Sequence, residues 1–391
     1  MLKKVLIIVE NLSVPFDRRV WLEAMALNEE GFGVTVICPR FKGEKGFEIL
    51  GGIAIYRYSP PPPTSGFLSY MFEFLYCFIM TFLLSVRVFF RHGFDIIHAC
   101  NPPDTFFLIG LFYKAFGKRF YFDQHDLCPE VYLSKYGAHR KDLLYRALLL
   151  LEYLTYKTAD KVIVTNNSYK EVAVSRGRLK KEKVFVVRTG PKLEMFKPAS
   201  YNPELKQGRK FLVSYLGVMA PQDGVDYLLL AIDVIVRRYD RRDILFNLIG
   251  GGDSLLDLES LKDELQLNDA VKFTGRIPDK ELMDYLAVSD VCVAPDPKNP
   301  LNDSSTMNKV LEYMAMAKPI VSFDLKESRF SAGDAALYAR PNDIHDFADK
   351  IIELIEDSDK RERMGRYGRE RLKGELSWEH NKRRLLDVYK Q

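Results

Sequence analysis

"KVLIIVENLSVPFDRRVWLEAMALNEEGFGVTVICP", residues 4–39, decides the fold class. A β-branched run stands at each end, and between them apolar residues recur at helical spacing until Gly31. Strand, helix and strand in this order imply a parallel sheet covered by helices on both faces, with right-handed crossovers. Lysines before an apolar run also resemble a signal peptide, but "VLIIV" is shorter than a signal sequence requires, so we predict a first strand.

The same alternation continues to residue 340 and divides the chain into two domains. Strands are predicted at 4–10, 33–39, 53–58, 94–100, 119–125, 161–166, 183–189, 210–217, 244–252, 270–276, 291–296, 319–324 and 335–340. The predicted fold class is α/β with two Rossmann-like domains, at 1–190 and 210–376, joined by a linker at 191–209. A last helix, 377–391, is expected to pack back on the first domain. Ligands in such sheets bind beyond the carboxyl ends of the strands.

Composition and charge narrow the classes of protein that fit. A length of 391 residues suits two domains, and the five scattered cysteines favour a reduced cytosol. The net charge is +4, yet residues 135–183 hold twelve Lys/Arg against five Asp/Glu, so the rest of the chain is slightly acidic. This basic excess fits an anionic membrane surface, a phosphorylated substrate or a nucleic acid, and equally an ordinary solvated surface.

Residues 67–90 are apolar nearly throughout, although they include Glu73 and Arg87. Three interpretations remain open: a membrane-spanning helix, a buried crossover helix, and a crossover helix that also touches a bilayer. Residues 143–160 form a second very apolar helix inside the basic region. Together these features favour a peripheral membrane protein.

In the second half, four polar or glycine-rich loops follow strands and should meet at one edge of the sheet. They are residues 218–224, 251–254, 276–279 and 297–306. Four such loops indicate a nucleotide-sized ligand, which a single loop would not.

The last of these loops leads into a helix expected at 307–317, with Ser305 or Thr306 as its cap. A helix start favours anions. Lys309 in the first turn opposes the helix dipole and so suggests a nearby anion, while Glu312 suits a pair of ribose hydroxyls. The alternative is an exposed Lys–Glu pair worth a few tenths of a kcal/mol.

In the first half, His125 and Asp126 directly follow a strand, and Asn101 ends the neighbouring one. Asp17 is a predicted helix cap, and the two arginines after it oppose the dipole of the helix that they begin. The acceptor-side candidates are Asp17, Arg18, Arg19, Asn101 and Asp126. The sequence holds no metal-ligand cluster, since its one D-x-D, at 357–359, is interpreted as solvated surface.

Five blocks in a fixed order resemble a known family. They are "FDQHD", "GVMAPQDGVDYLL", "LIGGGDS", "FTGRIPDKELMDYLAVSDVCVAPDP" and "NKVLEYMAMAKPIVSFD", with "SWEHNKRRLLDVYK" near the end. Together they resemble the retaining glycosyltransferases of family four, of the type found in exopolysaccharide and O-antigen assembly. The resemblance implies the GT-B fold, in which two Rossmann-like domains face a central cleft.

The resemblance assigns roles to individual residues. His125 matches the histidine over the donor sugar, and Glu312 the second glutamate of E-x7-E, which holds the ribose. Gly217 and Gly224 match the glycines of the first donor loop, while Arg276 and Ile277 match the segment against the base.

Three positions depart from the family pattern, and the family's Gly-Gly turn after the first strand is absent, with "PFDRR" in its place. Val218 and Asp223 stand where the family binds phosphate through Arg and Lys, and Ser304 replaces the first glutamate. Lys309 matches a lysine of one family branch and is expected to take over the diphosphate. Asp303, Ser304 or Asn308 would then contact sugar hydroxyls.

The resulting prediction is a retaining, metal-independent glycosyltransferase without a cofactor. It would move a hexosyl or N-acetylhexosaminyl group from a nucleotide-diphosphate sugar, UDP favoured over GDP, to a lipid-linked or glycan acceptor. The predicted location is the cytoplasmic membrane face, in surface polysaccharide biosynthesis, without nucleic acid. The alternatives are a catalytically silent sugar-nucleotide-binding scaffold and a sugar-nucleotide epimerase of the same fold. The catalytic candidates are His125, Lys309 and Asp303, and the donor-binding candidates are Gly217, Gln222, Gly224, Gly251, Asp253, Arg276, Ile277, Ser304, Ser305, Thr306, Asn308 and Glu312.

Overall fold

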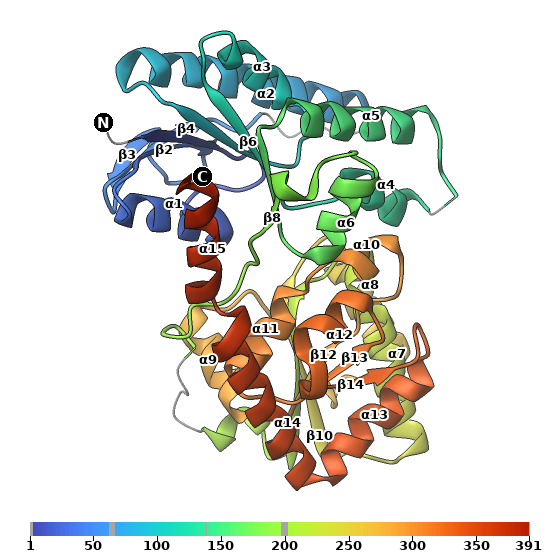
Figure 1. The fold of residues 1–391 in the computed structure, drawn as a ribbon. Coiled ribbons are helices and arrows are strands. Elements are labelled where there is room, and N and C mark those ends of the chain that lie inside the picture. The colour runs from blue at the N-terminus through green and yellow to red at the C-terminus, as the bar shows by residue number, and fades with distance from the viewer. Residues whose placement is uncertain (1–2, 62–66, 138, 197–201, 391) are drawn as a thin grey trace. The chain divides into compact units, whose positions relative to one another are not determined.

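The computed structural model describes residues 3–61, 67–137, 139–196 and 202–390, with the backbone alone for residues 67–71. The chain divides into two compact units (Figure 1). Unit 1 comprises Met1–Arg188 with Asn381–Gln391, and unit 2 comprises Thr189–His380. The predicted linker, 191–209, falls in unit 2, and its residues 197–201 lie outside the described residues.

Unit 1 is built on a sheet with the strand order β3-β4-β2-β1-β5-β6-β7-β8. All neighbours are parallel except β3 and β4. The strands are β1 (Lys4–Ile8), β2 (Gly33–Pro39), β3 (Phe47–Leu50), β4 (Ile53–Tyr58), β5 (Ile96–Cys100), β6 (Arg119–Gln124), β7 (Lys161–Val164) and β8 (Val184–Val186).

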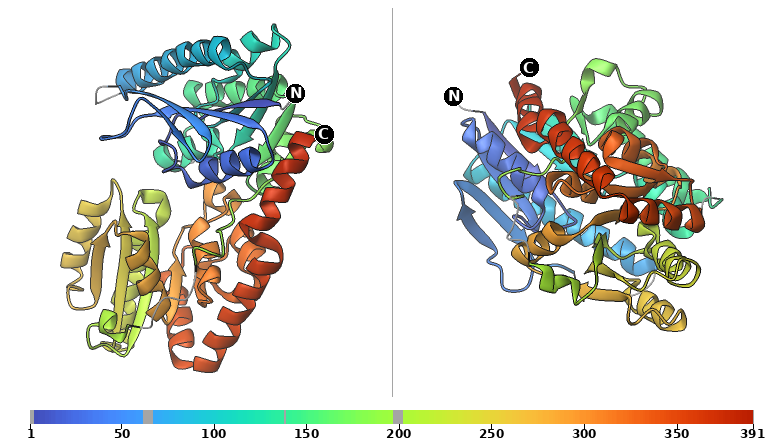
Figure 2. Two further views of the ribbon diagram at one scale, coloured as in Figure 1. Left: turned by 90° about the vertical axis from the view of Figure 1, so that its left-hand side faces the viewer. Right: turned by 90° about the horizontal axis from the view of Figure 1, so that it is seen from below.

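The helices of unit 1 cover both faces of this sheet. They are α1 (Arg18–Glu29), α2 (Phe67–Arg91), α3 (Phe107–Lys114), α4 (Cys128–Tyr136), α5 (Leu143–Thr158) and α6 (Asn167–Ser175). Figures 1 and 2 show α2, α3 and α5 on one face and α1 on the other. This placement follows from the right-handed crossover rule, because the chain moves across the sheet in opposite directions through α1 and through α2. Between the sheet and α2, α3, α5 and α6 lies one apolar core.

Unit 2 has a six-stranded parallel sheet with the order β11-β10-β9-β12-β13-β14. Its strands are β9 (Phe211–Val218), β10 (Ile244–Gly251), β11 (Val271–Gly275), β12 (Val291–Ala294), β13 (Ile320–Phe323) and β14 (Ala336–Ala339). Its helices are α7 (Val225–Arg238), α8 (Leu255–Glu264), α9 (Asp279–Val288), α10 (Pro300–Ser304), α11 (Asn308–Ala315), α12 (Lys326–Ala332), α13 (Ile344–Glu356) and α14 (Ser358–Arg371). Separate apolar cores fill the two faces of the sheet.

The final helix, α15 (Trp378–Lys390), begins in unit 2 and continues into unit 1 from Asn381 onward. In unit 1 its Tyr389 is buried and packs edge to face on Phe32 and Tyr121. Asn381 accepts a hydrogen bond from the Arg188 amide at 2.9 Å. The end of the chain therefore completes the core of unit 1.

The predicted strands are confirmed with shifts of a few residues at their ends, and the predicted first strand at 4–10 is β1. The prediction omitted β3, the edge strand, which pairs antiparallel with β4. Its residues Phe47, Ile49 and Leu50 are exposed, so the strand lacks the buried apolar run that marks the others.

The expected helix at 307–317, capped by Ser305 or Thr306, is wrong in its start. Residues 300–304 form the short helix α10, and α11 begins at Asn308 with Met307 in the cap position and no side-chain cap bond. The Ser305 hydroxyl instead donates to the Leu301 carbonyl, because the turn of α10 brings that acceptor within 2.8 Å. The D-x-D has a structural role, since Asp357 caps α14 by accepting from the Lys360 amide.

Candidate active site

Asn101 ties together the carboxyl ends of β5 and β6 in unit 1. Its side-chain oxygen accepts from the amides of His125 and Asp126, at 2.6 and 3.2 Å. Its side-chain nitrogen donates to Asp104 and to the Asp126 carbonyl, at 2.9 and 2.8 Å. Asn101 is buried, and these four bonds use its hydrogen-bonding capacity to fix the backbone that carries His125.

His125 and Arg19 converge on one buried carboxylate, that of Asp123. His125 Nε2 lies 2.6 Å from Asp123 Oδ2. The Arg19 guanidinium grips the same carboxylate with two bonds, at 2.7 and 3.1 Å, and donates a third to the Val187 carbonyl at 2.8 Å. Burial alone would raise the pKa of Asp123, but Arg19 and His125 outweigh it and hold that pKa well below its usual range. Burial opposes the charged form of His125, yet Asp123 keeps its pKa well above the ordinary value.

A second carboxylate, Glu23, extends this network into the interior. Glu23 Oε1 lies 3.1 Å from Arg19, and Glu23 Oε2 lies 3.3 Å from His98 Nε2. The other ring nitrogen of His98 lies 2.5 Å from the Tyr389 hydroxyl. The helix-start arginine at position 19 thus has a structural explanation, while Arg18 beside it is exposed.

His98, Cys100 and Asp123 place their ligand atoms within 4.8 Å of one another, and all three are buried. Asp123 is already engaged by Arg19 and His125, and His98 by Tyr389. These partners account for the carboxylate and the imidazole without an ion. Asp17 caps α1 by accepting from the Val20 amide at 3.0 Å, as predicted.

Glu10, at the carboxyl end of β1, is a titratable group that the sequence prediction missed. Burial, with a smaller contribution from the charge of Glu73, raises its pKa from 4.5 to about 8. Its Oε2 has no hydrogen-bond partner among the described residues. A carboxyl group that is protonated at neutral pH beside a strand end fits proton transfer, and the signal available in sequence was its place directly after a buried strand.

Glu10→Gln is expected to stabilise the protein in a pH-dependent way. Because the folded-state pKa is raised, the native state holds a proton that the unfolded chain releases above pH 4.5, so wild-type stability falls as the pH rises from 4.5 to 8. The variant escapes this loss, and its advantage should grow across that window to on the order of 5 kcal/mol at most. Thermal melts of wild type and variant at roughly pH 5, 7 and 9 check this prediction. An advantage that is equal at all three values would contradict the assigned pKa.

In unit 2 three of the four predicted loops, those after β9, β10 and β12, contact one another, and the convergence of the fourth, residues 276–279 after β11, stays a prediction. The Met219 amide donates to Gly251, and the Ser254 amide donates back to Met219, both at 3.0 Å. Asn302 donates to the carbonyls of Gln222 and Pro297, each at 2.8 Å, and so joins the loop before α10 to the loop after β9. Gly224 has a φ of +67°, and a Cβ there would lie 2.2 Å from the Pro295 carbonyl oxygen, so the approach of these loops requires glycine.

Lys309 lies at the centre of these loops and is buried. Its Nζ is 2.8 Å from Asp296 Oδ1 and 3.9 Å from Asp223 Oδ1, and it stands 4.8 Å from the centre of the Tyr215 ring. Burial disfavours its charge, but Asp296 leads the contacts that raise its pKa above the ordinary value. Burial raises the pKa of Asp223 to about 6, against the opposing charge of Lys309. The exposed Lys–Glu pair considered from the sequence is therefore replaced by a buried cation between two carboxylates.

The other predicted residues of unit 2 occupy the same sheet edge with different exposure. Asp303 is held away from Lys309, because its Oδ1 accepts from the Lys326 amide at the start of α12 and lies 3.5 Å from Lys298. Glu312 is half-buried on α11. Three of the remaining candidates are exposed: Asp253, Arg276 and Asn308. The others are half-buried: Gly217, Gln222, Gly251, Ile277, Ser304, Ser305 and Thr306.

Sequence reasoning missed Asp296, Tyr215 and Asn302. Asp296 follows a buried strand directly, the same signal that identified His125, and was available. Tyr215 lies inside β9, where nothing in its sequence neighbourhood separates it from a core tyrosine.

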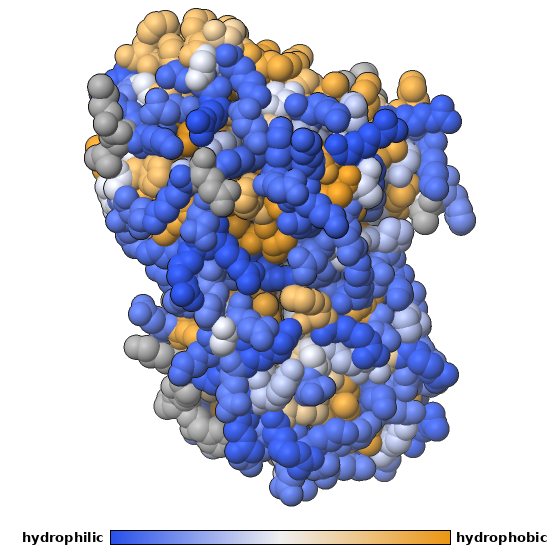
Figure 3. Space-filling view, viewed as in Figure 1, coloured by the Kyte–Doolittle hydropathy of each residue, from blue (hydrophilic) through white to orange (hydrophobic). Residues whose placement is uncertain are grey.

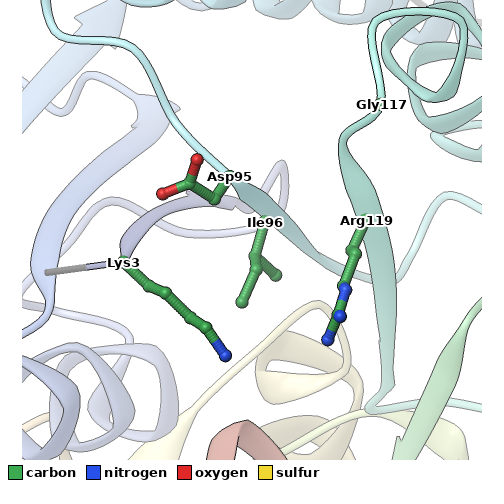
Figure 4. Close-up of a pocket in the computed structure, with 5 residues that line it drawn as sticks. All are labelled: Lys3, Asp95, Ile96, Gly117 and Arg119. Atoms are coloured by element: carbon green, nitrogen blue, oxygen red, sulfur yellow. The ribbon is translucent and has the colours of Figure 1, made fainter. Parts of the chain in front are cut away.

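A surface hollow in unit 1 lies away from Asn101 and His125, which follow the carboxyl ends of β5 and β6. It is lined by Lys3, Asp95, Ile96, Gly117 and Arg119, at the amino ends of β1, β5 and β6. Figure 4 shows the Lys3 and Arg119 side chains extending to the same side, with the Asp95 carboxylate turned away from them. Ligands of parallel α/β sheets bind at the opposite edge, so this hollow is not the predicted site.

Two family models match the chain, the first over most of the sheet of unit 1 and the second over the sheet of unit 2. Residues 17–194 match the family described as Glycosyltransferase Family 4, and residues 210–357 match the family described as Glycosyl transferases group 1. A curated relative, D-inositol 3-phosphate glycosyltransferase of Corynebacterium urealyticum, is 27% identical over 274 residues. The match covers 66% of this chain and 62% of the relative, so it spans less than two thirds of that protein.

Solved structures share the fold over nearly the whole chain. Sucrose-phosphate synthase from Thermosynechococcus elongatus superposes with a TM-score of 0.80 at 20% identity, covering 100% of this chain and 98% of that one. Anabaena HepE, solved in complex with UDP-glucose, gives 0.75 at 15% identity, with 99% of each chain covered. The two parallel-sheet units have the GT-B fold, as predicted.

Proposed function

Since the chain carries a Glycosyltransferase Family 4 domain followed by a Glycosyl transferases group 1 domain, we propose that it is a retaining, metal-independent glycosyltransferase that uses a nucleotide-diphosphate sugar. The observation that carries this proposal is the convergence of three strand-end loops of unit 2 around Lys309. Such an edge, with strand-end loops and the start of α11 beside a fixed cation, suits a diphosphate.

Lys309 is the proposed contact of the diphosphate, although Asp296 and Asp223 also approach it. With both carboxylates ionised, the three side chains carry one net negative charge. An approaching diphosphate disfavours a further negative charge and therefore raises the pKa of Asp223 above its value of about 6, so that Asp223 takes up a proton. Lys309, Asp296 and the protonated Asp223 then carry no net charge when the diphosphate reaches them, and the ammonium group remains available as a donor.

The reaction breaks the bond between the anomeric carbon and the diphosphate oxygen. In the proposed course, the acceptor hydroxyl forms its new bond to the same face of the sugar, and its proton passes to the departing phosphate oxygen. Lys309 and the backbone N–H groups stabilise the negative charge that develops on the leaving group. His125, whose ring is oriented by Asp123 and whose backbone is fixed by Asn101, is proposed to contact the donor sugar, and Glu312 the ribose.

The donor and acceptor are proposals of the same kind. UDP is favoured over GDP, and the UDP-glucose complex of HepE supports it. A lipid-linked or glycan acceptor at the cytoplasmic membrane face, in surface polysaccharide assembly, is proposed from the apolar helices and the basic excess. The name of the Corynebacterium relative, D-inositol 3-phosphate glycosyltransferase, adds a polar ring alcohol to the acceptors worth assaying.

A thermal-shift screen with UDP, GDP, ADP, dTDP and CMP, with and without EDTA, tests the donor site. One nucleoside diphosphate at about 100 times its Kd should stabilise the native state by about 2.7 kcal/mol, a rise of several degrees in Tm. The rise should be unaffected by EDTA and absent in Glu312→Ala. Glu362→Ala, which removes an exposed glutamate of α14 in the same unit, is the matched control and should keep the full shift.

The outcomes separate the candidates. Loss of the shift in EDTA would overturn metal independence. No shift with any nucleotide would overturn the donor site in unit 2. A shift without transfer of label from the matching nucleotide sugar to a membrane lipid extract would favour the catalytically silent scaffold if the nucleotide sugar is recovered unchanged, and the epimerase if it is recovered as its epimer.

A further inference from the structure

Unit 1 presents a continuous apolar surface formed by α2, α3 and α5, which we call the α2–α3–α5 surface. Its apolar members are between 42% and 83% exposed: Leu75, Ile79, Leu83, Phe90, Leu108, Leu111, Phe112, Phe116, Leu143 and Leu150. Figure 3 shows hydrophobic residues gathered along this edge of unit 1. Single exposed apolar residues are normal on a soluble protein, whereas ten on adjoining helices mark an interaction surface.

The three helices that carry this surface are in contact with one another. Phe82 of α2 packs edge to face on Phe112 of α3, with ring centres 5.2 Å apart. Lys114 at the end of α3 donates to the Thr158 carbonyl at the end of α5. The exposed side chains therefore belong to one layer and move as one body.

Helix α2 packs one stripe into the core and exposes apolar side chains on its opposite face. One stripe, Cys77, Thr81, Ser85 and Val88, is buried. The opposite stripe, spaced by four residues, is solvent-facing and runs through Leu75, Ile79, Leu83, Arg87 and Arg91. A helix that only completes a fold needs one apolar stripe, so the second requires another explanation.

Residues Phe72–Arg91 have the length and hydropathy of a membrane span, and 22% of an 18-residue window within them is buried in the structure. The buried stripe argues against spanning. Cys77 and Val88 belong to the same core as Tyr56 and Phe94, and Ser85 bonds the Tyr113 hydroxyl at 2.9 Å. Moving α2 into a bilayer would strip this core and break the crossover from β4 to β5. The helix fits a membrane only by lying along it.

Basic side chains surround the apolar members. Helices α2 and α3 together with residues 135–158 hold eight Lys/Arg against three Asp/Glu. On α5 the exposed positions are Leu143, Arg146, Leu150 and Lys157, so that cations stand between apolar side chains. Of the three acids, Glu152 is buried against Arg176 and Asp142 bonds Tyr132 and Arg140, which leaves Glu73 of α2 exposed. The outward charge of the surface is positive, which complements an anionic partner.

We propose that the α2–α3–α5 surface binds the interface of a bilayer containing anionic lipids, with α2 lying in the membrane plane. The leucine, isoleucine and phenylalanine side chains enter the boundary between headgroups and acyl chains, and the arginines and lysines meet lipid phosphates. This assigns a surface and a lipid charge to the proposed membrane location. Lipid binding and sugar transfer can fail separately, because nucleotide binding belongs to unit 2.

Vesicle flotation of the full chain tests the apolar part. Wild type should float with vesicles of phosphatidylcholine and phosphatidylglycerol. Ile79→Glu/Leu83→Glu should lose affinity by about tenfold or more for each side chain withdrawn. Leu256→Glu is the matched control, since Leu256 is a 76% exposed leucine on a helix of unit 2, and it should float like wild type. Phe112→Gln/Phe116→Gln, on α3 and in the turn directly after it, should lose affinity likewise and covers the case in which the α2 variant fails to fold.

The charged part has its own variant. Arg87→Gln/Arg146→Gln/Lys157→Gln should weaken binding by about fivefold for each cation removed, while Arg242→Gln in unit 2 should not. Binding to vesicles of phosphatidylcholine alone should be weaker than to the mixture by a similar factor. Equal binding to both vesicles would overturn the anionic preference.

Four further results would overturn the proposal. Wild type could stay at the bottom of the gradient, or the α2 variant could float as well as wild type. Resistance to alkaline carbonate extraction would show a spanning helix. A dimer that light scattering detects, that Ile79→Glu/Leu83→Glu dissociates, and that binds no vesicles would assign the surface to a second copy. The nucleotide-induced thermal shift, unchanged in every surface variant, shows in each case that the failure concerns lipid binding and not the donor site.

Discussion

Lys309→Ala is expected to lower the free energy of unfolding of unit 2 by about 3–5 kcal/mol and to abolish sugar transfer. Lys309 is 8% exposed and Asp296 2% exposed, with 2.8 Å between the ammonium nitrogen and the carboxylate. The second oxygen of Asp296 has no hydrogen-bond partner among the described residues. Removing the cation leaves a buried carboxylate without its counter-charge, which costs more than the pair itself contributes. This expected loss of stability differs from the prediction made from the sequence alone, which is that the same substitution leaves the fold intact.

A double variant separates the two effects of this substitution. Lys309→Met/Asp296→Asn removes both charges and keeps similar side-chain volumes, so it should recover most of the lost stability but not the transfer activity. Urea unfolding and hydrogen exchange of β9 and β12 measure the stability, and release of the nucleoside diphosphate measures transfer. Wild-type transfer in the double variant would contradict the role of Lys309 at the diphosphate. A single variant within about 1 kcal/mol of wild type would contradict the buried pair.

Asp123→Ala should have an effect of similar size in unit 1, about 3–5 kcal/mol. The substitution leaves Arg19 and His125 without their common carboxylate, and both side chains lie largely in the interior. The loss should appear as faster hydrogen exchange in β5, β6 and α1, with the strands of unit 2 unchanged. Asp233→Ala, which breaks the Asp233–Arg237 pair on α7, whose arginine is mostly exposed, is the matched control and should cost about 0.5 kcal/mol.

The effect of Asp123→Ala should depend on pH with a defined sign. Because the folded-state pKa of Asp123 is depressed, its contribution is present above the ordinary aspartate pKa of about 4 and is lost as the pH falls through the folded-state value. The difference between wild type and variant should therefore shrink below about pH 4. A difference that stays constant to lower pH would show that Asp123 stabilises unit 1 through packing and not through its charge.

The sequence was sufficient for most of the strands, because a strand buried on both faces leaves a continuous β-branched or aromatic run. Val5–Ile8 and Val291–Ala294 are of this kind. Edge strand β3 lacks such a run, since Ile49 faces solvent, and no local pattern separates it from a loop. The start of α11 was also misplaced, because the serines and threonine at 304–306 carry the composition of a cap while the turn of α10 uses Ser305 instead.

The candidate site was predicted in its loops but not in its ion pairs. The rule that polar residues gather at carboxyl strand ends found His125, Asn101 and the glycine loops. It also marks Asp296 as a strand-end residue, but it could not pair Asp296 with Lys309, because the two side chains lie on different elements thirteen residues apart. Arg19 and Asp123 are 104 residues apart, and only the assembled sheet makes them neighbours. Residue type and spacing report local burial, whereas the charge that neutralises a buried group is set by the tertiary fold.

The passage of α15 from unit 2 back into unit 1 fixes the order in which the two units can be completed during synthesis. The ribosome makes residues 1–188 first, yet Asn381 and Tyr389, which bond Arg188 and His98, follow only after all of unit 2. At ordinary elongation rates this delay is roughly 10–40 s. Unit 2 is one continuous segment, so all of its residues are available once His380 has been made. The unit whose synthesis begins second can therefore complete its fold first. The nascent first half must meanwhile keep the surface around His98 open for its last helix, a period in which chaperones have access to it.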